Sequence, residues 1–311
     1  MTLARRNRGV ALITAVLIAA LPASVAARLS WDNALDVRRT TVSLFRDQAI
    51  EIALGAESWA EQILAQDRDE SDTDHLGEIW AADLPGLPIE GTLNGEVFGK
   101  IEDLQGRFNI NNLIGQDGKV DQPSLEQFQR LLTALGLDVR YATLTADWLD
   151  SDQDASFPDG AEDPIYTGLI PPYRTANQLL SSTSELAALD GIDKKTLDIL
   201  LPHITALPKH TTINVNTATG PVLQSLGPNL TPEEVEQLMG ERAESGFADA
   251  RNTFAPLVAD DLKGEIDDST EFFELKLVVR IDTVRITYYS LLERSPQGGG
   301  VVPILRSLGT T

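Results

Sequence analysis

The chain has 311 residues, with 47 acidic against 25 basic side chains and no cysteine. Its formal charge of −22 argues against binding nucleic acid, because contacts with phosphates depend on Lys and Arg. The same charge disfavours anionic lipid headgroups and favours cations or basic partner surfaces. Without cysteine no disulfide contributes to stability, and the length is enough for a sizeable core and more than one lobe.

The first 27 residues combine a basic end with an uncharged apolar run. Three arginines precede Gly9, and residues 10–27 contain no charged side chain. Because basic residues stay on the cytoplasmic side of a membrane, the rest of the chain is expected to be exported. Two interpretations are open at this point. One is a signal peptide cleaved after Ala27; the other is a retained membrane helix, at the short end of the roughly 17–25 residues that span a bilayer.

Beyond Arg28 the sequence predicts a long amphipathic helix that ends near Gln66. Its apolar face is formed by Leu35, Val42, Phe45, Ala49, Ile52, Ala56, Trp59 and Ile63, at helical spacing. The acidic run 67–74 is too polar to continue the helix. An apolar segment at 10–27 that runs directly into an amphipathic helix at 28–66 favours the retained anchor over the signal peptide.

The start of this helix resembles the type IV pilins and the pseudopilins of type II secretion systems, at Arg8-Gly9 followed by Val10–Thr14. The resemblance implies that a prepilin peptidase cuts the Gly9–Val10 bond and methylates the new N-terminus. Most members carry glutamate at the fifth mature position, where a carboxylate neutralises the neighbouring subunit's N-terminal ammonium inside the membrane. This chain has Thr14 there. Within the class, that absence is typical of the minor pseudopilin K, and it indicates a subunit that does not repeat along the filament.

Strands are predicted at two distant places. The stretch Thr92–Ile101 contains an Asn-Gly turn between β-competent runs, which is a strong hairpin signal, and residues 107–111 form a further candidate strand. Near the C-terminus the sequence predicts an antiparallel hairpin, 272–281 and 284–293, then a flexible link at 295–300 and a last strand at 301–307. A sheet begun near Thr92 and finished after Phe272 makes the middle of the chain an insertion.

The middle of the chain is predicted to be helical. Ser124 is expected to cap a helix that Gly136 ends, and a second helix is expected at 142–149. Residues 214–216 fit either a strand or a link between two helical units.

An acidic loop follows the second helix and is the candidate metal site. Acidic residues at every second position can point several oxygens at one hard cation such as calcium. The residues expected to supply these oxygens are Asp150, Asp152, Asp154, Glu162 and Asp163. The loop is not an EF-hand, because Ala155 and Ala161 stand where that motif needs Gly and Glu. The alternative is a solvated acidic loop. Nearby aromatic residues and the calcium available outside the cytoplasm favour a calcium site.

Two groups of motifs are similar to those of type II secretion protein K. The central group is Asp147–Asp150, Gly160–Glu162, Tyr166, Pro172–Arg174, Asn177 and Glu185-Leu186, and the second is Thr212–Ala218. The resemblance implies an α+β, type IV pilin-like fold: a long N-terminal helix packed on a small antiparallel sheet, with a large α-helical domain inserted. It implies bound calcium and a place with minor pseudopilins I, J and H at the tip of the periplasmic pseudopilus.

The function implied is that of a non-enzymatic minor pseudopilin, which initiates or caps pseudopilus assembly for protein secretion across the outer membrane. The chain would cross the bacterial inner membrane once, in contact with its lipid, with a cytoplasmic N-terminus and the bulk in the periplasm. The expected divisions are a leader at 1–9, the membrane segment at 10–27, the amphipathic helix at 28–66, a first β region at 67–116, an inserted helical domain with the calcium loop at 117–212, a second helical segment at 213–268, and closing strands at 269–311.

The sequence leaves two alternative functions open. A secreted acidic calcium-binding hydrolase would need a conventional signal peptide and a catalytic motif, and the sequence has no G-x-S-x-G, H-E-x-x-H or G-x-G-x-x-G pattern. A helix-hairpin-helix DNA-binding module is suggested by segments 186–201 and 215–244. There Asp193 occupies a position where glycine is usual, which would place a negative charge toward phosphate. A small helical packing unit is therefore the favoured interpretation of both segments.

Overall fold

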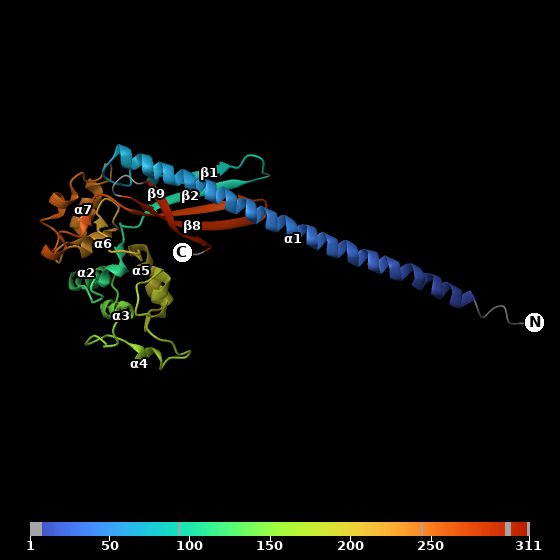
Figure 1. The fold of residues 1–311 in the computed structure, drawn as a ribbon, viewed down its shortest axis with the longest axis horizontal. Helices are drawn as coiled ribbons and strands as arrows, with labels where there is room; N and C mark the ends of the chain where they lie inside the picture. Colours follow the sequence, from blue (N-terminus) through green and yellow to red (C-terminus); the bar gives the residue numbers. More distant parts are fainter. Residues whose placement is uncertain (1–7, 93, 244, 296–299, 310–311) are drawn as a thin grey trace, which may run out of the picture.

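The computed structural model describes residues 8–309 except 93, 244 and 296–299. Residues 1–7 of the predicted leader, and most of the link expected at 295–300, lie outside the described residues. The remainder forms one long helix, a five-stranded sheet and a mainly helical domain (Figure 1).

Helix α1 runs without interruption from Arg8 to Glu70, through Pro22. Its first half projects from the rest of the molecule, while its second half lies along the sheet (Figure 1). Within the described part of the chain this is the one helix long and apolar enough to cross a membrane, and none of its most apolar stretch is buried. The prediction that a membrane segment continues directly into a second helical segment is confirmed, although the helix ends four residues later than expected.

The sheet is antiparallel, with strand order β1-β2-β7-β8-β9. Its strands are β1 (Leu84–Pro88), β2 (Glu96–Asp103), β7 (Phe272–Ile281), β8 (Val284–Arg294) and β9 (Val301–Leu308). The register pairs Val97 with Val279 and Val279 with Ile286. Two strands that are 168 residues apart in the sequence are therefore neighbours, because β2 ends at Asp103 and β7 begins at Phe272, and the residues between them are an insertion.

The C-terminal hairpin and the last strand lie where the sequence predicts them, but the first hairpin differs. Its turn is at Asn94, which has φ +56°, yet its first strand is β1, upstream of Thr92. Residues 107–111 do not join the sheet. Phe108–Asn109 forms the short strand β3, which pairs in parallel with β4 (Ile204–Thr205) inside the inserted domain.

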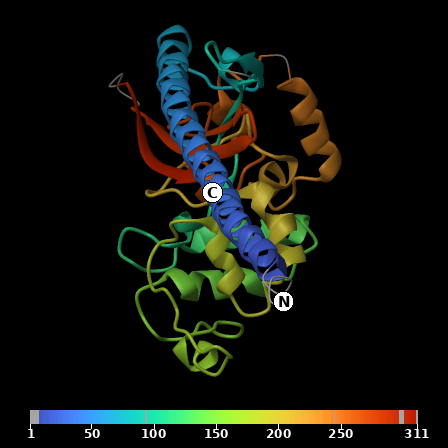
Figure 2. The same cartoon turned by 90° about the vertical axis from the view of Figure 1, so that its right-hand side faces the viewer.

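Helix α1 packs against β7, β8 and β9, and in Figure 2 it crosses in front of the sheet. The buried line of the helix is Ala49, Ala53, Glu57, Ala60 and Leu64. The predicted face is therefore rotated: Ile52, Ala56 and Ile63 lie at its edge, and Trp59 is 47% exposed. Alanine side chains let the helix approach the sheet closely, and the buried Glu57 accepts hydrogen bonds from Tyr288 (2.8 Å) and Arg306 (2.7 Å).

The inserted domain is built from short elements around one core. The helices are α2 (Gln122–Ala134), α3 (Arg140–Leu149), α4 (Asp163–Tyr166), α5 (Lys194–Leu200), α6 (Gly220–Ser225), α7 (Pro232–Glu241) and α8 (Ala250–Phe254). The domain also has short 3-10 helices at Ile110–Leu113, Thr183–Ala188, Leu201–His203 and Asp260–Leu262, and β5 (Ile213–Asn214) pairs in parallel with β6 (Ile266–Asp267). A further 3-10 helix, Ile79–Ala81, lies outside it, between α1 and β1.

The core of the inserted domain includes residues on both sides of the expected domain boundary between residues 116 and 117. Phe108 stacks on Phe128 with ring centroids 5.2 Å apart, so residues assigned to the first β region belong to the insertion. The expected segments 117–212 and 213–268 also share the core, since α2 packs on α6. The expected boundary at 116/117 is wrong because the insertion begins directly after β2, at Leu104.

Local helix signals were predicted partly correctly. Helix α2 ends before Gly136, which has φ +67°, but its cap is Asp121, whose carboxylate accepts the backbone N–H of Ser124. Ser124 itself is buried. Asp193 caps α5 by accepting the N–H of Thr196 at 2.7 Å. That carboxylate is at a helix start where a phosphate would otherwise sit, which supports the packing-unit interpretation.

The second motif, Thr212–Ala218, joins the inserted domain to the sheet. Asn214 donates from its amide to the Asp103 carboxylate (2.8 Å) and to the Asp74 carbonyl (3.0 Å). The hydroxyls of Thr217 and Thr270 each donate to the same Asp103 oxygen at 2.6 Å. Burial raises the pKa of Asp103 to about 6 despite these donors. We call these four residues, Asp103, Asn214, Thr217 and Thr270, the junction.

Candidate calcium site and anchor helix

The acidic loop connects α3 to α4 and folds back on itself. Asp150 is the C-terminal cap residue of α3, and Glu162 immediately precedes α4. The structure brings carboxylate oxygens of Asp150, Asp152 and Glu162 within 4.8 Å of one another. A calcium ion binds oxygens at about 2.3–2.6 Å, so oxygens on opposite sides of one ion would be about this far apart.

Three carboxylate oxygens around the loop are buried and lack a hydrogen-bond partner among the described residues: Asp147 Oδ1, Asp150 Oδ1 and Glu162 Oε1. Burial raises the pKa of Asp150 to about 6, with a further contribution from the charges of Asp152 and Asp147. Burial also raises the pKa of Glu162 to about 7, and the neighbouring carboxylates add to it. Buried acceptors that repel one another are costly unless a cation lies among them.

The other two predicted ligands are turned away from this group. Asp154 is exposed, and its backbone N–H donates to Asp152 Oδ1 at 2.8 Å. Asp163 accepts the backbone N–H of Thr175 at 3.1 Å and faces Arg174 at 3.6 Å. Asp163 is the first residue of α4, where a carboxylate favours the helix start, and this explains its different role.

Polar contacts from outside the loop fix its shape. The Asn177 amide donates to the Asp152 carbonyl at 2.8 Å, and its backbone N–H donates to the Trp148 carbonyl at 3.0 Å. The Thr175 hydroxyl donates to Glu162 at 3.1 Å. Gly160 lies so close to Asp147 that a Cβ there would be 2.1 Å from Asp147 Oδ2. Glycine is therefore required for this close approach.

An aromatic cluster lies behind the loop. Trp148 meets Tyr166 edge-on at 5.1 Å between ring centroids, and Tyr173 is 5.4 Å from Tyr166. The Tyr173 hydroxyl donates to the Ala188 carbonyl at 2.6 Å. Trp148 and Tyr166 thus pack behind the carboxylates as expected of a folded loop, whereas Phe157, the third aromatic residue near the loop, is 96% exposed. Oxygen-only donors, several of them unpartnered, fit a hard divalent cation of the calcium type.

Sequence reasoning missed two residues of this site. Asp147 and Asn177 were noted as motif members but not as parts of the site. Asp147 is fully buried, accepts the Ser156 N–H at 2.9 Å, and burial raises its pKa. Its position three residues before Asp150 on α3, close to one helical turn, is the signal that could have pointed to it.

At the other end of the molecule, Thr14 lies in the apolar stretch of α1. The Thr14 hydroxyl lies 3.0 Å from the Val10 and Ala11 carbonyls, so it hydrogen-bonds to its own helix. The Gly9–Val10 bond is within the first turns of α1. Cleavage at this bond stays a prediction.

Comparison with known proteins identifies the family. Models of type II secretion system protein K match residues 106–209 and 213–272. The chain is 35% identical over 319 residues to type II secretion system protein K of Pectobacterium carotovorum, covering 96% of this chain and 95% of the relative. Protein K of Pseudomonas aeruginosa is 38% identical over 253 residues, covering 78% of this chain and 74% of the relative.

The chain belongs to the type II secretion system protein K family. A chain of the crystal structure of the GspK-GspI-GspJ complex from the enterotoxigenic Escherichia coli type 2 secretion system has the same fold, with a TM-score of 0.70 and 23% identity, over 88% of this chain and all of that chain. The first protein K match starts at 106, just after β2 ends, and the second stops where β7 begins. The family models therefore cover most of the insertion.

Proposed function

We propose that this chain is a non-enzymatic minor pseudopilin that sits at the tip of the periplasmic pseudopilus, where it initiates or caps assembly. Membership of the protein K family supports the secretion role. The observation that carries the tip position is Thr14, which offers a hydroxyl where most members of the class have a carboxylate. An uncharged group cannot neutralise a neighbour's N-terminal ammonium inside the membrane, so this subunit suits an end of the filament rather than its interior.

The shape of the head supports the same position. The insertion lies at the end of the molecule opposite the N-terminus, beside the end of the sheet (Figure 1). A subunit that carries such a domain above its sheet would obstruct the next subunit along a filament axis. At the tip no subunit has to follow on that side.

The proposed partners are minor pseudopilins I and J, as in the complex that contains the structural relative, together with H. The membrane-directed half of α1 is the surface proposed for packing among the other pseudopilin helices, because its apolar side chains are exposed over the whole length. We further propose that prepilin peptidase cuts the Gly9–Val10 bond and methylates Val10. The mature chain would then cross the inner membrane once, with Trp31 (68% exposed) near the outer lipid interface and the bulk in the periplasm.

We also propose that Asp150, Asp152 and Glu162 hold a calcium ion, with Asp147 close behind them. The ion would supply the positive charge that these carboxylates lack. Its effect would be structural, because it would tie the end of α3 to the start of α4 and keep the loop folded against the aromatic cluster.

The tip assignment can be tested by changing Thr14 in the full-length chain. We expect wild-type chain extracted in detergent to co-purify with I and J and to be far less abundant than the major pseudopilin. Thr14→Glu supplies the missing carboxylate and should raise the ratio of this chain to the major subunit, although the insertion still limits incorporation inside the filament; Thr14→Ser, the matched control, should leave the ratio unchanged. A wild-type chain as abundant in the filament as the major subunit, or one that fails to bind I and J, would contradict the proposal.

The processing step is tested by the intact mass of the membrane-extracted protein. We expect the loss of residues 1–9 and the addition of one methyl group. A mass that corresponds to cleavage after Ala27 would instead support the secreted hydrolase. A gel-shift assay at low salt tests the DNA-binding alternative, for which we expect no shift.

A further inference from the structure

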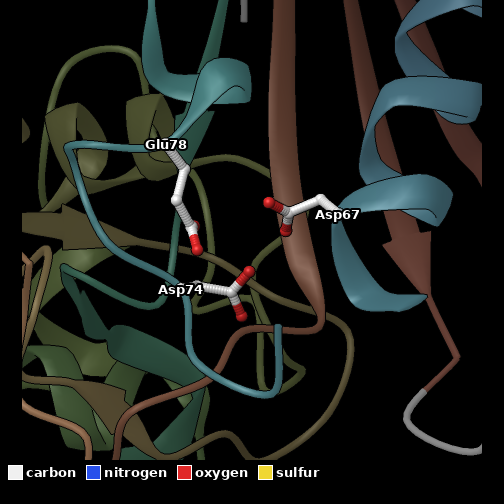
Figure 3. Close-up of side chains that lie close together, drawn as sticks. All are labelled: Asp67, Asp74 and Glu78. Atoms are coloured by element: carbon white, nitrogen blue, oxygen red, sulfur yellow. The ribbon is translucent and has the colours of Figure 1, made fainter. Parts of the chain in front are cut away.

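A second group of carboxylates lies at the end of α1, far along the chain from the acidic loop. Asp67 is on the last turn of α1, and Asp74 and Glu78 follow on the connection to the sheet. Figure 3 shows the three side chains pointing toward one another from these separate segments, and their oxygens lie within 4.8 Å of one another. We propose that Asp67, Asp74 and Glu78 form a second binding site for a divalent cation, of the calcium type.

The group carries more negative charge than its protein partners neutralise. Arg294 is the one arginine that pairs with it among the described residues: it contacts Asp67 at 3.1 Å and also pairs with Asp74. His75 lies 3.7 Å from Glu78, and it carries charge only when protonated. Three carboxylates against one guanidinium leave an excess of negative charge in a site whose side chains are 1–13% exposed. Burial, together with the charges of Glu78 and Asp74, raises the pKa of Asp67 to about 7.

Protein donors satisfy one oxygen of Asp74 but not the other. Asp74 Oδ2 accepts the Thr270 N–H at 2.7 Å and pairs with Arg294, while Asp74 Oδ1 is buried and has no hydrogen-bond partner among the described residues. Asp74 is 1% exposed, so bulk water does not solvate this oxygen. In Figure 3 one Asp74 oxygen points into the space between Asp67 and Glu78.

Glu78 is held in the same manner. Its Oε2 accepts the His75 N–H at 3.0 Å and the Trp80 ring N–H at 2.6 Å. These two bonds fix the carboxylate, and His75 Nε2 lies 3.7 Å from its other oxygen, Oε1. An unsatisfied buried carboxylate oxygen is destabilising, and a cation at about 2.3–2.6 Å would satisfy the one on Asp74 while relieving the repulsion among all three carboxylates.

The position gives such an ion a structural consequence. The Asp74 carbonyl accepts from Asn214 of the junction, the Asp74 N–H donates to the Asp268 carbonyl, and Arg294 ends β8. A cation here would tie the end of α1 to the sheet and, through Asp74, to the root of the insertion. This site is independent of the loop at 150–162 and of the tip assignment.

Calcium titration of the full-length chain in detergent, after treatment with a chelator, tests the proposal by calorimetry. We expect two calcium ions per wild-type chain and one per chain of Asp74→Asn or Asp67→Asn. The matched control is Asp72→Asn, a carboxylate in the same acidic run that is 96% exposed, and it should keep two. Asp150→Asn should lose the other ion and keep one, which separates the two sites.

Terbium provides a readout that locates the ion. Because Trp80 donates to Glu78, a terbium ion bound here should be sensitised by excitation of Trp80. In the Asp150→Asn chain we expect terbium luminescence that Trp80→Phe and Glu78→Gln each abolish. An Asp150→Asn chain that binds neither calcium nor terbium overturns the proposal, whether or not Asp74→Asn folds, and so does a stoichiometry that Asp67→Asn leaves unchanged.

Discussion

Different interactions stabilise the two regions of the molecule. One region is the sheet with helix α1, and the other is the inserted domain. In the sheet, β7 alternates from Phe273 onward, and Phe273, Leu275, Leu277, Val279 and Ile281 all contribute to one apolar core against α1. The inserted domain has short helices, and many of its loops are fixed by buried amides and carboxylates. The sheet is thus stabilised mainly by regular apolar packing. The insertion additionally depends on polar groups, each of which needs a specific partner.

The largest expected effect on stability comes from removing one buried aromatic ring from either core. Phe128→Ala removes a fully buried ring from the insertion, and Phe273→Ala removes one from the sheet. Each should cost about 3–5 kcal/mol of unfolding free energy. Hydrogen exchange should show lost protection mainly at 104–271 for the first variant and mainly in the sheet for the second. Equal loss over the whole chain in both variants would show instead that the two regions unfold as one unit.

The next largest effect is expected at the junction. Asp103→Ala leaves four donors, on Asn214, Thr217, Thr270 and the Gln105 backbone, without their acceptor, which should cost about 2–4 kcal/mol. Asp103→Asn keeps an acceptor oxygen and should cost clearly less. Urea unfolding followed by tryptophan fluorescence measures both. An Asp103→Ala chain as stable as wild type would mean that the junction does not couple the two regions.

The difference between the regions also explains how much the sequence could predict. The hairpin around Asp282 and the strand after it follow from alternation and turn chemistry, which are local signals, and both were predicted within a residue or two. The continuity of α1 also follows from a local signal, the helical spacing of its apolar residues. The buried line of α1 was misplaced because Glu57 is buried by Tyr288 and Arg306, over 230 residues away, and no helical periodicity contains that information.

In the insertion, residue types indicated the chemistry but not the geometry. The acidic loop was predicted as a whole, and the structure gathers Asp150, Asp152 and Glu162 from it, while Asp154 and Asp163 are directed elsewhere by an exposed turn and by α4. Alternation of acidic residues cannot say which oxygens face inward. The run 67–74 was read only as a helix stop, since its convergence with Glu78 depends on the path of the chain after α1.

Loss of calcium from the acidic loop should destabilise the insertion, and a chelator would also empty the site proposed at the end of α1. At a calcium concentration about 100 times its dissociation constant, an ion at the acidic loop would contribute about 2.7 kcal/mol, which a chelator removes. We therefore expect a lower melting temperature with chelator, and a smaller chelator effect in Asp150→Asn and Asp152→Asn. Asp154→Asn, at an exposed carboxylate outside the cluster, is the control and should respond like wild type. A melting temperature that neither the chelator nor these substitutions change would indicate a metal-free acidic loop.

The smallest expected effect is one of pH, and it should have opposite signs at Glu57 and at the acidic loop when calcium is absent. Burial raises the pKa of Glu57, but hydrogen bonds led by Arg306 outweigh it, so the pKa lies below its ordinary value of 4.5. A lowered pKa means that Glu57 stabilises the α1–sheet contact above about pH 4.5, and that this contribution is lost as the pH falls. The pKa values of Asp150 and Glu162 are raised to about 6 and 7, so the loop without calcium is most stable below pH 4 and loses stability as the pH rises to about 7.

Calcium should reverse the second trend, because the ion binds only the deprotonated carboxylates, so its affinity should rise between pH 5 and about 7. Hydrogen exchange between pH 4 and pH 7, with and without chelator, separates the two regions. Glu57→Gln should remove the acid-induced loosening of α1 without changing the behaviour of the loop. If acid loosens the calcium-free loop as well as α1, the buried carboxylates of the loop do not carry the raised pKa values on which this contrast depends.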